Sequence, residues 1–199
     1  SRLIGIGIAV LTALALVTGT LPAVKAPTAA AQSVADDAGG SIMAPQGPGP
    51  LYRVDPQVLS DAALGQVINS HPASMPAFAG YGVTAIAYRS TDTDDRPMLA
   101  TATVVRPHNA RPNGPVLSYQ HYLNALGQGC APTQTLVNPT LETVQDNAMA
   151  FLRYQLDRGW TVIIPDHLGP KVAYPGGRLS ARIVLDGMRA VRDDPRFDS

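Results

Sequence analysis

Hydrophobic and polar positions alternate most clearly in two neighbouring segments of the chain. Residues 82–88 alternate as in a half-buried strand, and residues 98–105 form a second run rich in β-favouring side chains. The polar cluster 91–95 between them is typical of a turn. Arg106–Pro107 ends the second strand, because proline has no N–H to donate to the ladder. The pattern therefore predicts an antiparallel hairpin.

Further along, the pattern predicts strands that alternate with helices. The apolar run 116–119 predicts a short buried strand, and the continuous run 160–164 predicts a strand buried on both faces of a parallel sheet. Helical periodicity predicts three helices, over 56–68 with Asp55 as N-cap, from Asn138–Pro139 to a stop at Gly159, and over 180–192.

A hairpin followed by strand–helix–strand–helix is typical of an α/β protein. We expect a mostly parallel sheet with an antiparallel hairpin at its start. Such a sheet requires more parallel strands than the 199 residues supply, so we expect an incomplete domain.

The first 50 residues differ from the rest of the chain. Arg2, an apolar stretch of about 15 residues and Ala29–Ala30–Ala31 are the parts of a secretory signal peptide. The stretch is shorter than the roughly 20 apolar residues that span a bilayer, which disfavours a membrane anchor. We therefore expect a signal peptide over 1–31, a flexible Pro/Gly/Ala linker over 32–50 and a folded region over 51–199. The protein would be secreted or associated with the cell envelope.

Composition and charge exclude several classes of function. Fifteen basic and fifteen acidic residues balance, and no basic run is present, so the sequence does not predict nucleic-acid binding. The four histidines are too scattered to predict a zinc site. No phosphate-binding glycine loop of a known motif is present, and we expect no cofactor.

Three blocks of sequence carry a resemblance to a known family. They are 116–133, which ends in Cys–Ala–Pro–Thr, 159–170, and 181–190. Together, and in this order, they resemble the secretory lipase family of actinobacteria and yeasts. The resemblance implies an α/β-hydrolase fold, hydrolysis of lipid or short-chain carboxylic esters by a Ser–His–Asp mechanism, and a role in lipid catabolism.

The sequence lacks the element that would carry the nucleophile of such an enzyme. The catalytic serine lies in a Gly-x-Ser-x-Gly turn, and none of Ser41, Ser118 and Ser180 has this context. We therefore expect no catalytic residue among these 199 and a triad that lies beyond them. In this fold the next parallel neighbour of strand 161–164 would lead into that turn, so we expect this strand to have one unpaired edge.

Four residues are candidates for a site. Tyr122 and Asn124 match, by resemblance, the element that contributes one side of the oxyanion hole, although the family usually has an acid at the position of Asn124. Asn124 is equally compatible with a role in shaping the loop. Asp166 follows a buried strand, where α/β proteins bind ligands, but it can also shape the loop before Gly169 by accepting backbone hydrogen bonds. The resemblance also implies that Cys130, the single cysteine, pairs with a cysteine outside these residues.

A triad of His121, Asp166 and His167 is rejected, because no activated serine accompanies either histidine. Two alternatives to a lipase remain open. One is another acyl-transfer or esterase activity on the same fold. The other is a non-catalytic secreted envelope or binding module.

Overall fold

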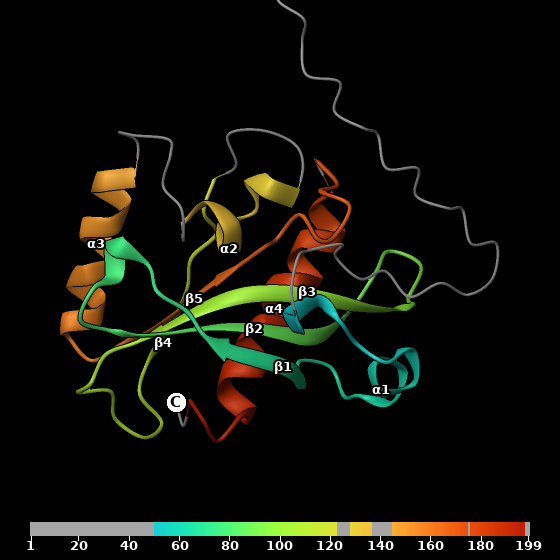
Figure 1. Ribbon diagram of the computed structural model, residues 1–199, viewed down its shortest axis with the longest axis horizontal. Helices are drawn as coiled ribbons and strands as arrows, with labels where there is room; N and C mark the ends of the chain where they lie inside the picture. Colours follow the sequence, from blue (N-terminus) through green and yellow to red (C-terminus); the bar gives the residue numbers. More distant parts are fainter. Residues whose placement is uncertain (1–49, 123–127, 137–144, 175, 198–199) are drawn as a thin grey trace, which may run out of the picture. The chain divides into compact units, whose positions relative to one another are not determined.

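The computed structural model describes residues 50–122, 128–136, 145–174 and 176–197, which form a five-stranded sheet with helices on both faces (Figure 1). The strand order is β1-β2-β3-β5-β4. The sheet is mixed, because β4 and β5 are parallel and the other described neighbours are antiparallel. The predicted α/β class is confirmed.

The predicted hairpin is the longest feature of the sheet. Its strands β2 (Gly82–Thr91) and β3 (Pro97–Arg106) pair in register over their whole length, from Gly82 opposite Arg106 to Thr91 opposite Pro97. The short strand β4 (Val116–Ser118) and the strand β5 (Thr161–Pro165) lie where the apolar runs predicted them. Every residue of β5 is buried.

The pairing of β5 corrects the expectation that this strand has an unpaired edge. β5 pairs with β3 on one side, where Val105 lies opposite Val162, and with β4 on the other, where Leu117 lies opposite Val162. The outermost strand at this side of the described sheet is β4, which is half-buried and three residues long. The crossover from β4 places β5 between β3 and β4, inside the sheet. The order of the strands along the chain does not reveal this position.

The predicted helix over 56–68 is also wrong beyond its first turns. Helix α1 (Pro56–Asp61) begins as expected, with the Asp55 side chain accepting the N–H of Gln57 at 2.8 Å. It ends early, and residues 67–72 instead form strand β1 (Val67–Pro72) on the edge of the hairpin. Gly65 has a φ of +81° and donates its N–H to the Arg89 carbonyl at 2.9 Å, so pairing with β2 replaces helical periodicity.

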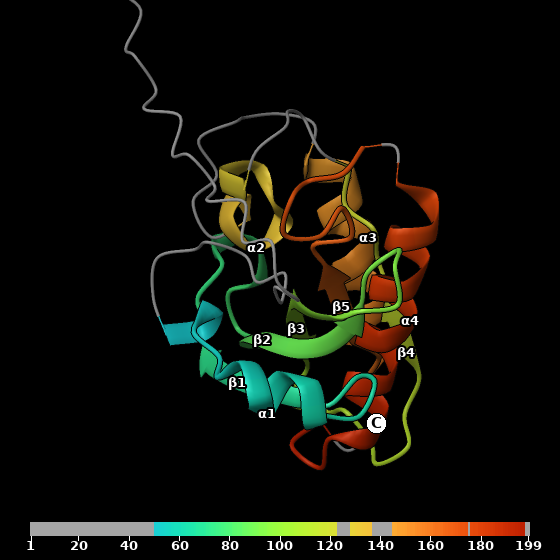
Figure 2. The ribbon, with the colours of Figure 1, turned by 90° about the vertical axis from the view of Figure 1, so that its right-hand side faces the viewer.

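The faces of the sheet are covered by different helices (Figure 2). Helix α4 (Gly177–Asp193) packs on one face, where Ile183, Ala190 and Val191 join a core with Ile86 and Ile163. Helix α3 (Gln145–Asp157) packs on the other face. That face also carries α1, α2 (Pro132–Thr135) and the 3-10 helices η1 (Pro50–Tyr52) and η2 (Pro76–Phe78); a third, η3 (Gln128–Cys130), precedes α2.

One boundary of α3 can be compared with its predicted signal. The predicted start of α3 at Asn138–Pro139 lies outside the described residues, and its end agrees with the prediction, since Gly159 has a φ of +87°. Among the described helices, none has the length and apolar character needed to cross a bilayer.

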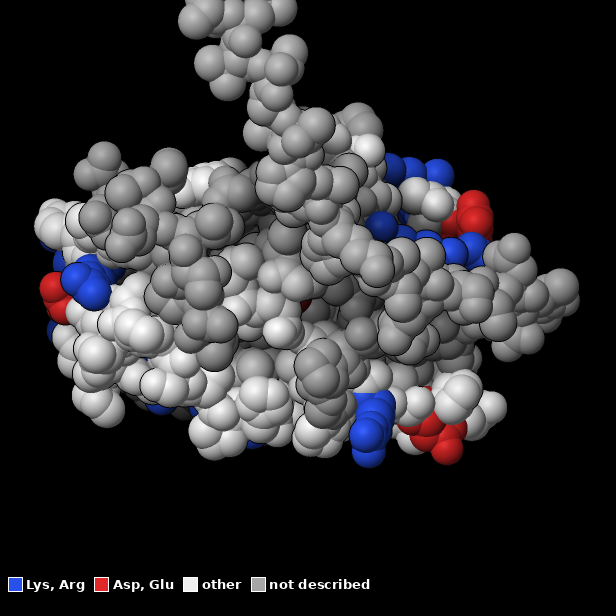
Figure 3. All heavy atoms as spheres, turned by 45° about the horizontal axis from the view of Figure 1, so that its top comes forward, with Lys and Arg blue, Asp and Glu red and all other residues white. Residues whose placement is uncertain are grey.

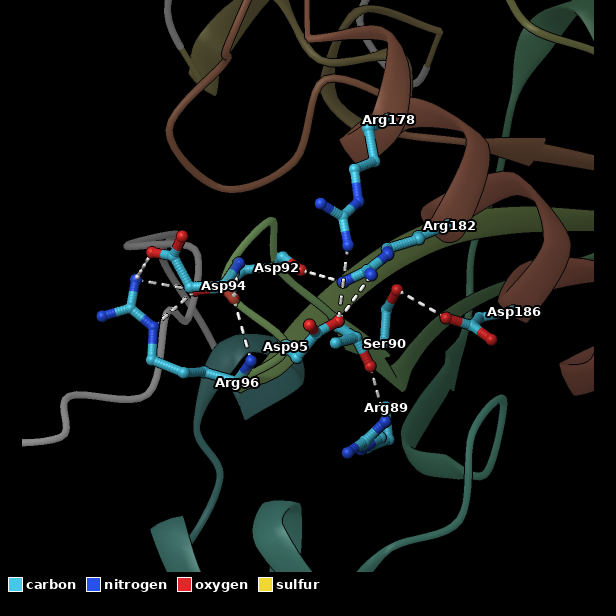
Figure 4. A network of polar contacts seen from close by, with 10 residues as sticks. Arg89, Ser90, Asp92, Asp94, Asp95, Arg96, Arg178, Arg182 and Asp186 are labelled. Carbon is cyan, nitrogen blue, oxygen red and sulfur yellow. Dashed lines mark hydrogen bonds and ion pairs between the residues drawn. The ribbon is translucent and has the colours of Figure 1, made fainter.

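Polar contacts join α4 to the hairpin (Figure 4). Asp186 is 2% exposed, accepts the Ser90 hydroxyl at 2.8 Å and pairs with Arg189 at 2.6 Å. At the turn between β2 and β3, Arg182 binds the Asp95 carboxylate at 2.5 Å. A buried carboxylate needs such partners, because an unpaired charge is costly away from water. These contacts fix the position of α4 along the hairpin.

Close contact between α4 and the sheet depends on a glycine. A Cβ atom on Gly187 would lie 2.9 Å from the Tyr88 hydroxyl oxygen and 3.1 Å from the Ile163 Cδ1. Tyr88 is fully buried and donates its hydroxyl to the Ile183 carbonyl at 2.9 Å, so it cannot move away without losing that bond. Position 187 is therefore restricted to glycine by space.

We expect Gly187→Ala to lower the free energy of unfolding by about 1–3 kcal/mol, the usual cost of an overpacked core. Gly177→Ala is the matched control, because no atom lies within 4 Å of its added Cβ and alanine favours a helix. Urea denaturation of both variants measures the difference. Equal stabilities of the two variants would contradict the close approach of α4.

Candidate active site

The carboxyl ends of β4 and β5 meet at one edge of the sheet, because these two strands are parallel. The ladder continues past β4, where Tyr119 donates its N–H to the Ile163 carbonyl at 2.8 Å. Tyr122 therefore follows one strand and Asp166 the other at the same edge. In open α/β sheets this edge is where ligands bind. We call residues 119–122, 130–134 and 166–167 the carboxyl-edge cluster.

The Asp166 carboxylate lies at the centre of this cluster. It is 8% exposed, and its Oδ2 accepts the hydroxyls of Thr101, at 2.6 Å, and of Thr133. Its Oδ1 accepts the Thr133 N–H at 2.9 Å. Among the described residues, this side chain thus accepts its backbone hydrogen bond from α2 and none from the loop that follows Asp166. One carboxylate joins the end of β5 to β3 and to the Cys–Ala–Pro–Thr element.

Burial changes the protonation of Asp166. Loss of solvent raises its pKa from 3.8 to about 6, and the hydrogen bonds from Thr101 and Thr133 oppose part of this rise. Tyr52 of η1 extends the same network, since its hydroxyl accepts the Gln134 amide and burial raises its pKa. Neither Thr101 nor Tyr52 was predicted as a site residue, because both are brought here from distant segments.

Two histidines, His121 and His167, belong to the same cluster and lie close enough to interact electrostatically. His121 is 2% exposed, and its ring lies 4.5 Å from that of Tyr122 and 5.8 Å from that of Tyr119. Burial lowers the pKa of both His121 and His167, and the proximity of His167 lowers that of His121 further. In the described part of the chain the buried Nδ1 atoms of both rings have no hydrogen-bond partner.

Among the described residues, this arrangement places imidazoles of lowered pKa together without an activated serine. In the described residues, the donors to the Asp166 carboxylate come from Thr101 and Thr133, and neither histidine is one of them. The rejected triad of His121, Asp166 and His167 therefore finds no support in the geometry. Among the same residues, no three metal-ligating side chains are placed to share an ion.

The structure describes two of the other three predicted site residues, Tyr122 and Cys130. Tyr122 is 37% exposed at the rim of the cluster. Asn124 lies outside the described residues, so its role at the oxyanion hole stays a prediction. Cys130 is half-buried, carries a free thiol and lies three residues before Thr133.

Figure 3 views the molecule with the side carrying α2 turned forward, and the charged side chains of the described residues lie mainly at its margins.

Comparison with known proteins identifies relatives of this chain. Residues 135–199 match the family model described as secretory lipase. Lipase 7 of Candida albicans is 31% identical over 141 residues, which cover 67% of this chain and 33% of that protein. A Mycobacterium tuberculosis protein named probable inactive lipase is 30% identical over 156 residues, covering 74% of this chain and 34% of that protein.

Among solved structures, Candida antarctica lipase A in its closed state superposes with a TM-score of 0.61 at 27% identity. The match covers 69% of this chain and 34% of that one. The chain therefore spans about a third of the length of the relatives that it matches.

The raised pKa of Asp166 predicts a pH-dependent stability. Between pH 3.8 and about 6 the unfolded carboxyl ionises while the folded one keeps its proton, so stability falls as the pH rises through this window. The full fall is about 3 kcal/mol. In Asp166→Asn this step disappears, while the amide retains an acceptor for the Thr133 N–H and a donor for the threonine hydroxyls.

Urea denaturation of both proteins between pH 3.5 and 7 tests this prediction. The stability of Asp166→Asn relative to the parent should rise by about 3 kcal/mol across the window. Thr101→Val should move the step to higher pH. The hydrogen bond from the Thr101 hydroxyl lowers the pKa of Asp166, and this variant removes it. A pH-independent difference between Asp166→Asn and the parent would contradict the assignment.

Proposed function

Because this chain belongs to the secretory lipase family, we propose that it forms part of a secreted enzyme that hydrolyses carboxylic esters of lipids. The observation that carries the proposal is the match of residues 135–199 to the secretory lipase model. The lipase A fold, superposed over 69% of the chain, supports it independently. Substrates of this kind include acylglycerols and short-chain esters.

The carboxyl-edge cluster suits one side of an ester-binding site. Tyr119 and Tyr122 pack against the buried His121 ring, and an aromatic group of this kind favours an uncharged ester and its acyl chain. In our proposal the N–H of Asn124 stabilises the oxyanion of the tetrahedral intermediate. Asp166 is a positioning residue, because it holds α2 against β3 and β5 and does not face the ester.

The nucleophile of the proposed reaction is not assigned to this sequence. The 199 residues contain no Gly-x-Ser-x-Gly turn, the feature that exposes the serine of an α/β-hydrolase. We propose a Ser–His–Asp mechanism in which histidine is the general base and all three residues lie outside these 199. Secretion through a signal peptide at 1–31 is part of the same proposal. No cofactor takes part.

A second function is a secreted module that binds lipid esters without hydrolysing them. The resemblance to a Mycobacterium tuberculosis protein named probable inactive lipase favours it. Treating the protein from the medium of expressing cells with a fluorophosphonate probe discriminates between the two. An active serine hydrolase is labelled covalently, whereas a binding module is retained on triolein droplets and is not labelled.

We expect the 199-residue polypeptide to hydrolyse p-nitrophenyl butyrate no faster than the uncatalysed background, because it lacks a positioned nucleophile. Release of p-nitrophenol by the purified polypeptide measures this. Turnover that disappears in His121→Ala or Asp166→Ala would contradict the proposed location of the triad. The Arg111→Ala variant, at an exposed position between β3 and β4, is a control for loss of activity unrelated to the carboxyl-edge cluster.

We propose that Cys130 forms a disulfide with a cysteine outside these 199 residues, since an unpaired thiol is unusual in a secreted protein. In the secreted protein, a maleimide should label Cys130 only after unfolding and reduction. A Cys130→Ser variant identifies the labelled peptide by mass spectrometry. Full labelling of the unfolded protein without reductant would rule out the pairing.

A further inference from the structure

A cavity of about 450 Å³ lies at the open end of the hairpin, away from the carboxyl-edge cluster. It is bounded by the end of β1, the start of β2, the end of β3 and the segment after α4. Its polar lining consists of Ser70, His71, Thr84, Arg106, His108 and Arg196, and Phe197 forms an apolar wall. We call it the basic cavity.

The basic cavity lies at the end of β3, whereas the carboxyl-edge cluster contacts the opposite face of β3 near its middle. Thr84 lies opposite Val104 and Gly82 lies opposite Arg106 at one end of the hairpin. Val104 belongs to the core under α4, and alternation along the strand puts Arg106 on this face as well. Thr101, which binds Asp166, is an odd-numbered residue of the same strand and faces the other way. The cavity is therefore a separate place on the molecule.

Every charged side chain in the lining of the basic cavity is a basic one. Arg196 is partly neutralised, because its guanidinium binds the Asp194 carboxylate with Nε at 2.8 Å and also donates to the Ser70 hydroxyl. Arg106 is different. Within the described part of the chain, its guanidinium has no hydrogen bond and no ion pair, and its Nε is shielded from water.

A shielded donor on a cation is costly unless an acceptor reaches it. The other polar side chains of the lining include the Thr84 hydroxyl and the His108 imidazole, both of which can donate hydrogen bonds. Such a set of donors around a guanidinium fork matches an oxyanion with several acceptor oxygens. A phosphate group uses more of these donors than a carboxylate can.

The basic cavity has space for a phosphate group beside Arg106. Gly82, directly opposite Arg106, has no side chain, and the only atom within 4 Å of an added Cβ is the Arg106 carbonyl oxygen at 3.4 Å. The bare backbone of β2 therefore leaves the floor beside the guanidinium open. The volume exceeds that of a phosphate, so a substituent on the phosphate can remain in the cavity mouth.

We propose that the basic cavity is a binding site for a phosphate group, with Arg106 as its principal ligand and His108 and Thr84 as further donors. The group can belong to free phosphate or to the headgroup of a phosphomonoester lipid. Ligand binding here is independent of ester hydrolysis at the other end of the sheet.

Isothermal titration calorimetry of the purified chain with sodium phosphate at pH 7.5 and constant ionic strength tests the proposal. We expect saturable binding that weakens at least about tenfold in Arg106→Gln, since a charge-assisted hydrogen bond is lost. Gly82→Val should weaken it similarly by filling the floor while all charges are kept. Arg178→Gln, an exposed arginine whose Asp95 contact is 3.8 Å, is the control for net charge and should bind like the parent.

Co-sedimentation with vesicles distinguishes the two sources of the phosphate. Retention on phosphatidylcholine mixed with phosphatidic acid, but not on phosphatidylcholine alone, assigns the site to a lipid headgroup if Arg106→Gln abolishes it. Calorimetric binding without such retention assigns it to soluble phosphate. Absence of both, or binding that Arg106→Gln leaves unchanged, would overturn the proposal. Circular dichroism spectra matching the parent confirm that each variant is folded.

Discussion

The pairing of β5 with β3 on one side and β4 on the other is the constraint on which the rest of the structure depends. Every residue of β5 is buried, so its backbone N–H and carbonyl groups need partners within the sheet. Antiparallel pairing with β3 attaches the hairpin, and parallel pairing with β4 attaches the crossover through α3. Two units that are local in sequence thereby become one sheet with helices on both faces.

The same pairing creates the carboxyl-edge cluster. Asp166 directly follows β5, and its N–H donates to the Thr101 carbonyl of β3 at 2.9 Å. This pairing positions its carboxylate to accept hydrogen bonds from Thr101 and Thr133. A buried carboxyl with three hydrogen bonds is a strong geometric restraint, because breaking any of them leaves a polar group unsatisfied. Packing and positioning of the candidate site thus rest on one side chain.

The carboxyl-edge cluster and the basic cavity differ in chemical character. In the cluster, burial lowers the pKa of His121 and His167 and raises that of Asp166, and each shift favours the neutral form. The basic cavity is lined instead by the guanidinium groups of Arg106 and Arg196. An uncharged ester and an anionic group would therefore be bound at different places. The sheet between them includes β2 and β3, which are paired over ten residues each.

The sequence alone determined the parts that depend on local pattern. Alternation predicted the hairpin, the continuous run 160–164 predicted a strand buried on both faces, and the period of 180–192 predicted α4. The quoted blocks carried the resemblance to secretory lipases, which the comparisons support. Asp166 could be singled out because it follows a buried strand. These features are set by neighbours close in the chain, and periodicity records them directly.

Tertiary structure decided everything that depends on pairing between distant segments. Residues 67–72 form a strand because the edge of β2 was available, although the predicted helix extended into this segment as far as Ile68. The crossover placed β5 inside the sheet, so its edges are both satisfied. The partners of Asp166, at Thr101 and Thr133, and the unpartnered guanidinium of Arg106 are likewise products of the assembled fold. Long-range hydrogen bonds and burial leave no periodic trace in the sequence, which is why only the folded chain reveals them.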